Sequence, residues 1–122
     1  MDLLLVDDSK TMRLLVQRAI RQAGYRDLTV WEAESGAEAM EKLRTKTPSL
    51  ILSDWNMPGI SGIDFLRALR EGNNLTPFGF ITSEGTKKVR DIAMSNGASF
   101  IIVKPFSVDD LQAALDTIFG GN

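Results

Sequence analysis

Three aspartates follow short runs of aliphatic residues, at positions where a hydrophobic strand would end. Asp7 and Asp8 come directly after residues 3–6, and Asp54 comes after residues 50–53. A carboxylate at the edge of a core loses hydration, which is costly unless the group has a partner. Clustered carboxylates also repel one another, so at least one pKa should rise unless a cation lies among them. The pattern therefore predicts a cation site.

Two cations are candidates for this place. Mg²⁺ is a hard ion that accepts one or two carboxylates together with water and phosphate oxygens. Lys104 ends another aliphatic run and precedes Pro105. With the hydroxyl of Thr82, these residues form the parts of a phosphoryl-transfer site. Asp54 is then the nucleophile that becomes an acyl phosphate, and catalysis comes from positioning and charge neutralisation.

The elements that must position these residues alternate along the chain. Short strand-like runs are separated by longer amphipathic runs with one apolar stripe. Several strands are almost continuously aliphatic, which suits a parallel sheet covered on both faces. We predict an α/β fold, a doubly wound five-stranded (βα)5 sheet, with its site beyond the carboxyl ends of the strands. The expected strands are residues 2–6, 28–33, 50–54, 78–82 and 100–103.

Helix boundaries are marked by two kinds of residue. Ser35, Ser61 and Ser107 each stand three residues before an acid, which is the spacing of a capping box. Glycines stand where the amphipathic runs should end, which favours helix termination there. They are Gly24, Gly72 and Gly97.

Composition limits the function classes. A chain of 122 residues fits one domain, residues 1–122. Its 14 basic and 16 acidic side chains give a formal charge of −2, which disfavours direct nucleic-acid binding. The absence of cysteine and histidine excludes disulfides, thiolate zinc sites and Ser-His-Asp triads. No apolar stretch approaches a membrane span and no signal-peptide flank is present, so a cytoplasmic protein is expected.

The whole chain resembles the receiver domain of two-component response regulators. The resemblance rests on Asp7-Asp8, Asp54, Thr82 and Lys104-Pro105-Phe106. Asp8-Ser9, Thr11-Met12-Arg13 and Asp54-Trp55-Asn56-Met57-Pro58 are most similar to the stand-alone chemotaxis regulators of CheY type. The resemblance implies a flavodoxin-like sheet with strand order 2-1-3-4-5.

The resemblance also implies roles at the site. Asp54 is the phosphoacceptor, Thr82 the switch hydroxyl, and Lys104 the contact to the phosphoryl group, with a cis Lys104–Pro105 bond. Mg²⁺ is held directly by Asp8, Asp54 and the backbone carbonyl of Asn56, and mainly through water by Asp7.

Two neighbours of these residues have expected roles of their own. Asn56 and Glu84 flank the path of the water that hydrolyses the acyl phosphate. Trp55, beside the acceptor, is expected to report on the state of the site.

The implied partners are a sensor histidine kinase as phosphodonor and a downstream protein target. Because the chain ends at Gly120-Gly121-Asn122, its output is expected to be protein binding by a monomer, not turnover as an enzyme. Chemotaxis is the leading context, with the flagellar motor switch as a candidate target. A phosphorelay intermediate and a receiver from a larger regulator or hybrid kinase remain alternatives.

Other readings are less favoured. An aspartyl-phosphate phosphatase or mutase would have an acid where Asn56 stands. A nucleotide binder would have a glycine-rich loop where Asp7-Asp8-Ser9-Lys10 stands.

One position departs from the family. Receivers couple the switch threonine to an aromatic residue three positions before the lysine, and here that position is Ile101. Phe100 is adjacent, but strand alternation sends it to the opposite face. The aromatic rotation of the family therefore does not transfer unchanged.

Overall fold

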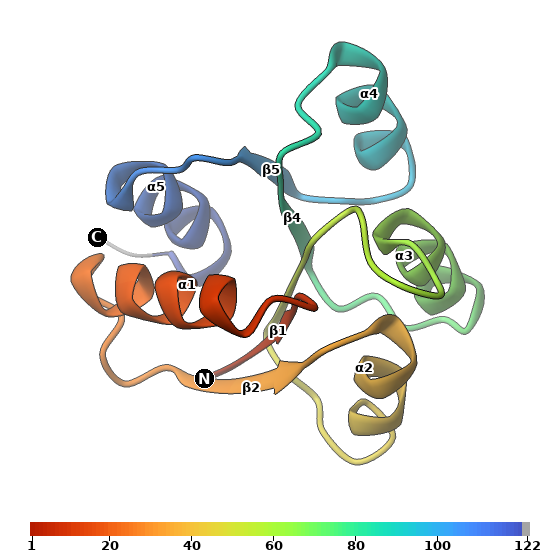
Figure 1. The fold of residues 1–122 in the computed structure, drawn as a ribbon. Helices are drawn as coiled ribbons and strands as arrows, with labels where there is room; N and C mark the ends of the chain where they lie inside the picture. The colour runs from red at the N-terminus through yellow and green to blue at the C-terminus, as the bar shows by residue number, and fades with distance from the viewer. Residues whose placement is uncertain (121–122) are drawn as a thin grey trace.

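The computed structural model describes residues 1–120. The sequence analysis used Gly120-Gly121-Asn122 in its prediction of the output, and the last two of these residues lie outside the described residues. Strands and helices alternate from β1 to α5 (Figure 1). In chain order they are β1 (Asp2–Val6), α1 (Lys10–Gln22), β2 (Thr29–Ala33), α2 (Gly36–Lys42), β3 (Leu50–Ser53), α3 (Gly62–Glu71), β4 (Phe78–Thr82), α4 (Lys87–Ser95), β5 (Phe100–Val103) and α5 (Val108–Phe119).

The five strands form one parallel sheet in the order β2-β1-β3-β4-β5, which confirms the predicted fold class and strand order. Val6 at the end of β1 is in register with Ala33 of β2 and with Ser53 of β3. Thr82 at the end of β4 is in register with Val103 of β5. The carboxyl ends of the strands therefore meet along a single edge of the sheet.

Two predicted strand boundaries were wrong by one residue. β2 begins at Thr29, not at residue 28, because Thr29 is in register with Asp2, the first residue of β1. β3 ends at Ser53, not at Asp54. The Asp54 N–H still donates to Val6 at 3.0 Å, but the Asp54 carbonyl accepts the Ser53 hydroxyl at 2.9 Å and leaves the ladder.

The helices cover the two faces of the sheet unequally. α1 and α5 lie side by side on one face, and α2, α3 and α4 cover the other (Figure 1). Strand alternation divides the core accordingly: Leu3 and Leu5 contact the α1 and α5 layer, while Leu4 and Val6 face the other three helices.

No helix within residues 1–120 has both the length and the apolarity needed to cross a membrane.

Serine and threonine side chains cap all the helices in the described part of the chain. The predicted caps Ser35, Ser61 and Ser107 each accept a hydrogen bond from the N–H three residues on. Of these three caps, only Ser107 also forms the reciprocal hydrogen bond of a capping box, in which its N–H donates to the Asp110 carboxylate at 3.1 Å. At the other end, Gly24 and Gly97 follow α1 and α4 with φ of +100° and +95°, a conformation that favours glycine.

The end of α3 differs in one detail. Gly72 follows the helix as predicted but has a φ of −83°, and the next residue, Asn73, takes the left-handed conformation.

A polar contact joins the loop after α1 to α5 at the far end from the predicted site. The Tyr25 hydroxyl donates to the Asp116 carboxylate, and the Tyr25 ring packs on Phe119 with the ring centroids 5.7 Å apart. Burial first, and then the Asp116 carboxylate, raise the pKa of Tyr25 to about 12. The folded protein therefore favours the neutral phenol.

The Tyr25 contact predicts a measurable titration. Tyr25 is the only tyrosine in the sequence, so absorbance of the phenolate reports on it alone. At pH 11 we expect the phenol to stay largely neutral in the folded protein and largely ionised in denaturant. Because the folded pKa lies above the unfolded pKa, this group's contribution to stability declines as pH rises from 10.0 to about 12.

Asp116→Asn removes the carboxylate and should move the titration of the folded protein toward its ordinary range. A midpoint near 10.0 in the unsubstituted folded protein would contradict the contact.

Candidate functional site

Asp7, Asp54 and Lys104 each stand one residue beyond a strand, and the backbone N–H of each is held by the neighbouring strand. The Lys104 N–H donates to the Thr82 carbonyl at 2.9 Å, just as the Asp54 N–H donates to Val6. Each residue therefore stands one step beyond its strand without leaving the hydrogen-bonded sheet. This anchoring fixes where the side chains begin and aims them at the same edge.

The three aspartates converge as the sequence analysis expected. Carboxylate oxygens of Asp7, Asp8 and Asp54 all lie within 4.8 Å of one another. Asp7 is buried, Asp54 is half-buried and Asp8 is exposed. An all-oxygen donor set at this spacing is suited to a hard divalent cation, so the residues present fit Mg²⁺.

Lys104 reaches two of the three acids. Its Nζ lies 3.1 Å from Oδ2 of Asp54 and 3.3 Å from Oδ2 of Asp7, and its side chain is 17% exposed. The Lys104–Pro105 peptide bond is cis, as the resemblance implies. The lysine therefore neutralises part of the acid cluster and leaves Asp8 to solvent.

The electrostatic consequence is clearest at Asp7. Burial raises the pKa of the Asp7 carboxyl, and the nearby Asp54 charge adds to the rise. The Ser9 N–H, which donates to Oδ1 at 2.9 Å, and the Lys104 ammonium oppose it. Desolvation is thus the main cause of the raised pKa, ahead of the carboxylate repulsion on which the sequence analysis relied.

Asp54 has its two carboxylate oxygens in different environments. Oδ1 accepts the backbone N–H of Trp55 at 2.6 Å and that of Asn56 at 3.4 Å, while Oδ2 faces Lys104. The Trp55 ring packs against Phe80 of β4, with centroids 5.0 Å apart. The side chain of Asp54 is therefore held in one orientation, and Trp55 lies next to it in the chain.

A close backbone approach holds the loop that follows Asp54. The Gly62 N–H, at the start of α3, donates to the Trp55 carbonyl at 2.7 Å. A Cβ on Gly62 would lie 2.1 Å from the Asp54 carbonyl oxygen and 3.0 Å from the Phe80 ring. Only glycine allows this approach, because the obstacle is backbone and cannot rotate away.

Thr82 ends β4, and Asn56 and Glu84 lie on the loops that border the site. Thr82 is fully buried at the end of β4, and its hydroxyl oxygen accepts the Glu84 N–H at 3.2 Å. The Asn56 amide donates to the Glu84 carboxylate at 3.2 Å, joining the loop after β3 to the loop after β4. The sequence analysis placed Asn56 and Glu84 near one path, and the structure adds that they contact each other.

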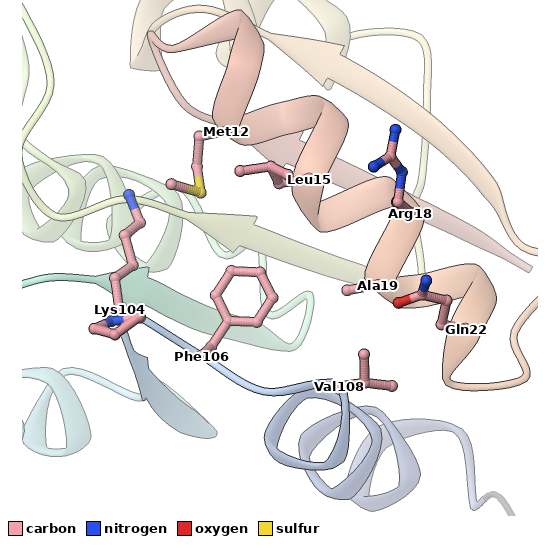
Figure 2. Close-up of a pocket in the computed structure, with 9 residues that line it drawn as sticks. Met12, Leu15, Arg18, Ala19, Gln22, Lys104, Phe106 and Val108 are labelled. Carbon is pink, nitrogen blue, oxygen red and sulfur yellow. The ribbon is translucent and has the colours of Figure 1, made fainter.

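A groove of about 280 Å³ opens between α1 and the segment after β5 (Figure 2). Met12, Leu15 and Ala19 line it from α1, and Phe106 and Lys104 line it from the other side. Its walls are largely apolar, and Leu15 is exposed. The groove therefore borders the acid cluster through Lys104.

The geometry agrees with a known family. The model of the response regulator receiver domain matches residues 3–116. This chain belongs to that family. Chemotaxis protein CheY1 of Helicobacter pylori (strain J99) is 40% identical over 125 residues, which cover 100% of this chain and 99% of that protein. The chain is thus a CheY-like receiver.

Solved structures give the same result for the fold. The chemotaxis response regulator CheY4 of Vibrio cholerae has a TM-score of 0.83 and 32% identity over 96% of this chain and 97% of that chain. The receiver domain of a Francisella response regulator, 1452, has a TM-score of 0.84 and 25% identity over 98% and 96% of the two chains.

Ile101 stands where the family resemblance led us to expect an aromatic residue, and the structure shows how the position is filled. Ile101 pairs with Phe80 across β4 and β5, is half-buried, and faces the α4 side of the sheet. Phe100 faces α5 instead, as strand alternation predicts. Its ring lies where a Cβ on Gly79 would be, 2.2 Å from the nearest ring carbon. Phe100 is therefore fixed against Gly79 and does not replace the missing aromatic.

Two residues that support the site carried no assigned role in the sequence analysis. Gly62 gave no signal, because the need for glycine arises from its approach to the Asp54 carbonyl, which depends on the path of the loop between them. Arg13 did give one: it lies three residues before Val16 on the buried stripe of α1, and it is 6% exposed. A charge on an apolar stripe indicates a buried partner.

Proposed function

We propose that this receiver accepts a phosphoryl group on Asp54 from a partner histidine kinase, in a Mg²⁺-dependent reaction that switches protein binding. The observation that carries the proposal is the position of Lys104 Nζ, 3.1 Å from Asp54 and 3.3 Å from Asp7. A fixed cation beside a half-buried carboxylate, with two more acids around it, suits transfer of a highly charged group.

In the transfer step, an Asp54 carboxylate oxygen attacks the phosphorus of the donor phosphohistidine. The oxygen–phosphorus bond forms as the phosphorus–nitrogen bond breaks, and the imidazole leaves with the electron pair of that bond. The Trp55 and Asn56 N–H groups hold Oδ1, which keeps the carboxylate oriented. Lys104 then has a phosphoryl oxygen to bind in place of the carboxylate oxygen.

Asp8, Asp54 and the Asn56 carbonyl would hold Mg²⁺ directly, and Asp7 would act mainly through water. Bound Mg²⁺ supplies positive charge that neutralises both the acids and the phosphoryl oxygens. Asp8 is suited to this role because it is exposed and, within residues 1–120, its carboxylate has no hydrogen bond or ion pair.

Thr82 would act as the switch hydroxyl. Its oxygen already accepts the Glu84 N–H, and its own proton has no protein acceptor among the described residues. That proton is available to a phosphoryl oxygen on Asp54. Movement of Thr82 toward the phosphoryl group would be passed to β5 through Ile101, with a smaller change of surface than an aromatic ring would give.

The partners follow from the same proposal. The donor histidine has to approach the open edge of the sheet, and the apolar groove beside Lys104 borders that approach. In this proposal the chain acts as a monomeric receiver in the cytoplasm. Its output is the binding of a protein target, not turnover of a substrate. Chemotaxis is the leading context, with the flagellar motor switch as the target. A phosphorelay intermediate is the second candidate, and a pulldown with phosphorylated and unmodified protein distinguishes the two.

Fluorescence of Trp55 tests the proposal. The sequence contains two tryptophans, so Trp31→Phe leaves Trp55 as the only reporter. Mg²⁺ should change the emission once, and acetyl phosphate should then change it a second time. Asp54→Asn should abolish the second change. A second change that persists in Asp54→Asn would contradict phosphorylation at this residue.

In this proposal, Asn56 influences the rate at which the acyl phosphate on Asp54 is hydrolysed. Its amide donates to the Glu84 carboxylate at 3.2 Å, and in this proposal the same amide orients the attacking water. Asn56→Met fills the path and removes the polar group, so we expect hydrolysis of the acyl phosphate to slow by about 10-fold.

Glu84→Gln, which keeps an acceptor for the Asn56 amide, is the matched control and should have a smaller effect. The decay of phosphorylated protein after removal of the donor measures both rates. An unchanged rate in Asn56→Met would exclude this role.

A further inference from the structure

Arg13 makes two hydrogen bonds from the buried face of α1. Its Nη1 donates to the Asp7 carbonyl oxygen at 2.6 Å, and its Nε donates to the Glu32 carboxylate at 2.9 Å. The arginine side chain is 8% exposed, whereas that of Glu32 is 43% exposed. A guanidinium loses hydration when it is buried, and these two acceptors compensate for the loss.

The contact fixes the peptide that joins Asp7 to Asp8. The Asp7 N–H donates to the Ala33 carbonyl at 3.1 Å, and the Asp7 carbonyl accepts from Arg13. The Asp7 N–H is therefore bound to the last residue of β2 directly, and the Asp7 carbonyl is linked to Glu32 of β2 through Arg13. The Asp7 carbonyl belongs to the same peptide plane as the Asp8 N–H, so the direction of the Asp8 side chain depends on it.

Asp8 has no other restraint of this kind. Its side chain is exposed and forms no ion pair or hydrogen bond within the described chain. Glu32, in contrast, is held at its backbone, because the Lys42 ammonium of α2 donates to the Glu32 carbonyl. The contacts thus run from α2 through β2 and Arg13 to the peptide that carries Asp8.

We propose that Arg13 is a positioning residue for the metal site, which orients Asp8 through the Asp7–Asp8 peptide. The inference rests on the proposed function, because it assigns Asp8 to Mg²⁺. Arg13 does not contact the ion or the phosphoryl group in this proposal. Its effect comes from the direction that it gives to a ligand, which is the role of outer groups in many metal sites.

The charge of Arg13 and its hydrogen bond to Asp7 predict opposite changes in Mg²⁺ affinity when Arg13 is replaced. A cation behind the acid cluster repels a divalent ion, so its removal would tighten Mg²⁺ binding if charge alone mattered. Loss of the hydrogen bond to Asp7 frees the peptide and would weaken binding. The sign of the change in Mg²⁺ affinity therefore separates the two effects.

The test uses two substitutions of Arg13 and one control. Arg13→Gln removes the charge, and Arg13→Lys keeps it but replaces the two-pronged donor. Arg18→Gln makes the same chemical change on the exposed side of the same helix. The Mg²⁺ dissociation constant is measured by Trp55 fluorescence in the Trp31→Phe background, well below each variant's melting temperature.

We expect Arg13→Gln to weaken Mg²⁺ binding by about 10-fold. Arg13→Lys should weaken it several-fold despite its charge, and Arg18→Gln should leave it unchanged. Unchanged or tighter Mg²⁺ binding in the Arg13 variants overturns the inference. This holds even if the variants melt at a lower temperature, because a loss of stability without a loss of Mg²⁺ affinity shows only a structural role for Arg13. An equal loss in Arg18→Gln overturns it too. Absence of Mg²⁺ binding in the unsubstituted protein overturns the proposed metal site and this inference together.

Discussion

Replacing Lys104 with glutamine is expected to slow phosphorylation of Asp54 by about 100-fold, the loss typical of removing one preorganised group that stabilises developing charge. Lys104 Nζ is the cation that lies 3.1 Å from the acceptor oxygen. Glutamine keeps much of the length of the side chain and removes its charge. The rate is measured with acetyl phosphate at saturating Mg²⁺, with folding checked by circular dichroism.

The same substitution should move Mg²⁺ affinity in the other direction. Lys104 shares Asp7 and Asp54 with the proposed ion, so its removal reduces repulsion and should tighten Mg²⁺ binding. Slower transfer together with tighter metal binding would be hard to obtain by simple damage to the fold. Lys88→Gln, an exposed lysine on α4, should change neither quantity. Transfer at the normal rate in Lys104→Gln would contradict the assigned role.

Replacing Gly62 with alanine is expected to destabilise the protein by about 3 kcal/mol, at the upper end of the range for overpacked sites. The new Cβ would lie 2.1 Å from the Asp54 carbonyl oxygen, so the acceptor loop has to move. Alanine is a better helix former than glycine, and propensity alone predicts the opposite sign. Urea unfolding measures the change.

Gly72→Ala is the matched control for this prediction. Gly72 has a φ of −83°, and a Cβ there would meet its nearest atom at 3.5 Å, which is ordinary contact. We expect its unfolding free energy to change by less than about 1 kcal/mol. Equal stability in Gly62→Ala and the unsubstituted protein would show that the close approach to Asp54 does not constrain the loop.

The position of the acid cluster could be predicted from the sequence because two local patterns determine it. Aliphatic runs identify the strands, and parallel strands bring their carboxyl ends to one edge. Asp7, Asp54 and Lys104 each follow such a run directly, so their convergence needs no knowledge of the loops. The strand order itself depended on the family resemblance.

The contacts behind the site could not be predicted in the same way. Arg13 meets Glu32 and the Asp7 carbonyl only after α1 has packed on the sheet. Gly62 is required because the loop after β3 returns across Asp54, and loop paths leave little trace in periodicity. The end of β3 was misplaced by one residue for a related reason, since the Ser53 hydroxyl takes the carbonyl of Asp54 out of the ladder.

Intact-protein mass spectrometry after incubation with acetyl phosphate and Mg²⁺ tests the central claim most directly. The account predicts a gain of one phosphoryl group, about 80 Da, that is lost in Asp54→Asn and when the metal is chelated. No gain in the unsubstituted protein, or the same gain in Asp54→Asn, would contradict phosphorylation of Asp54.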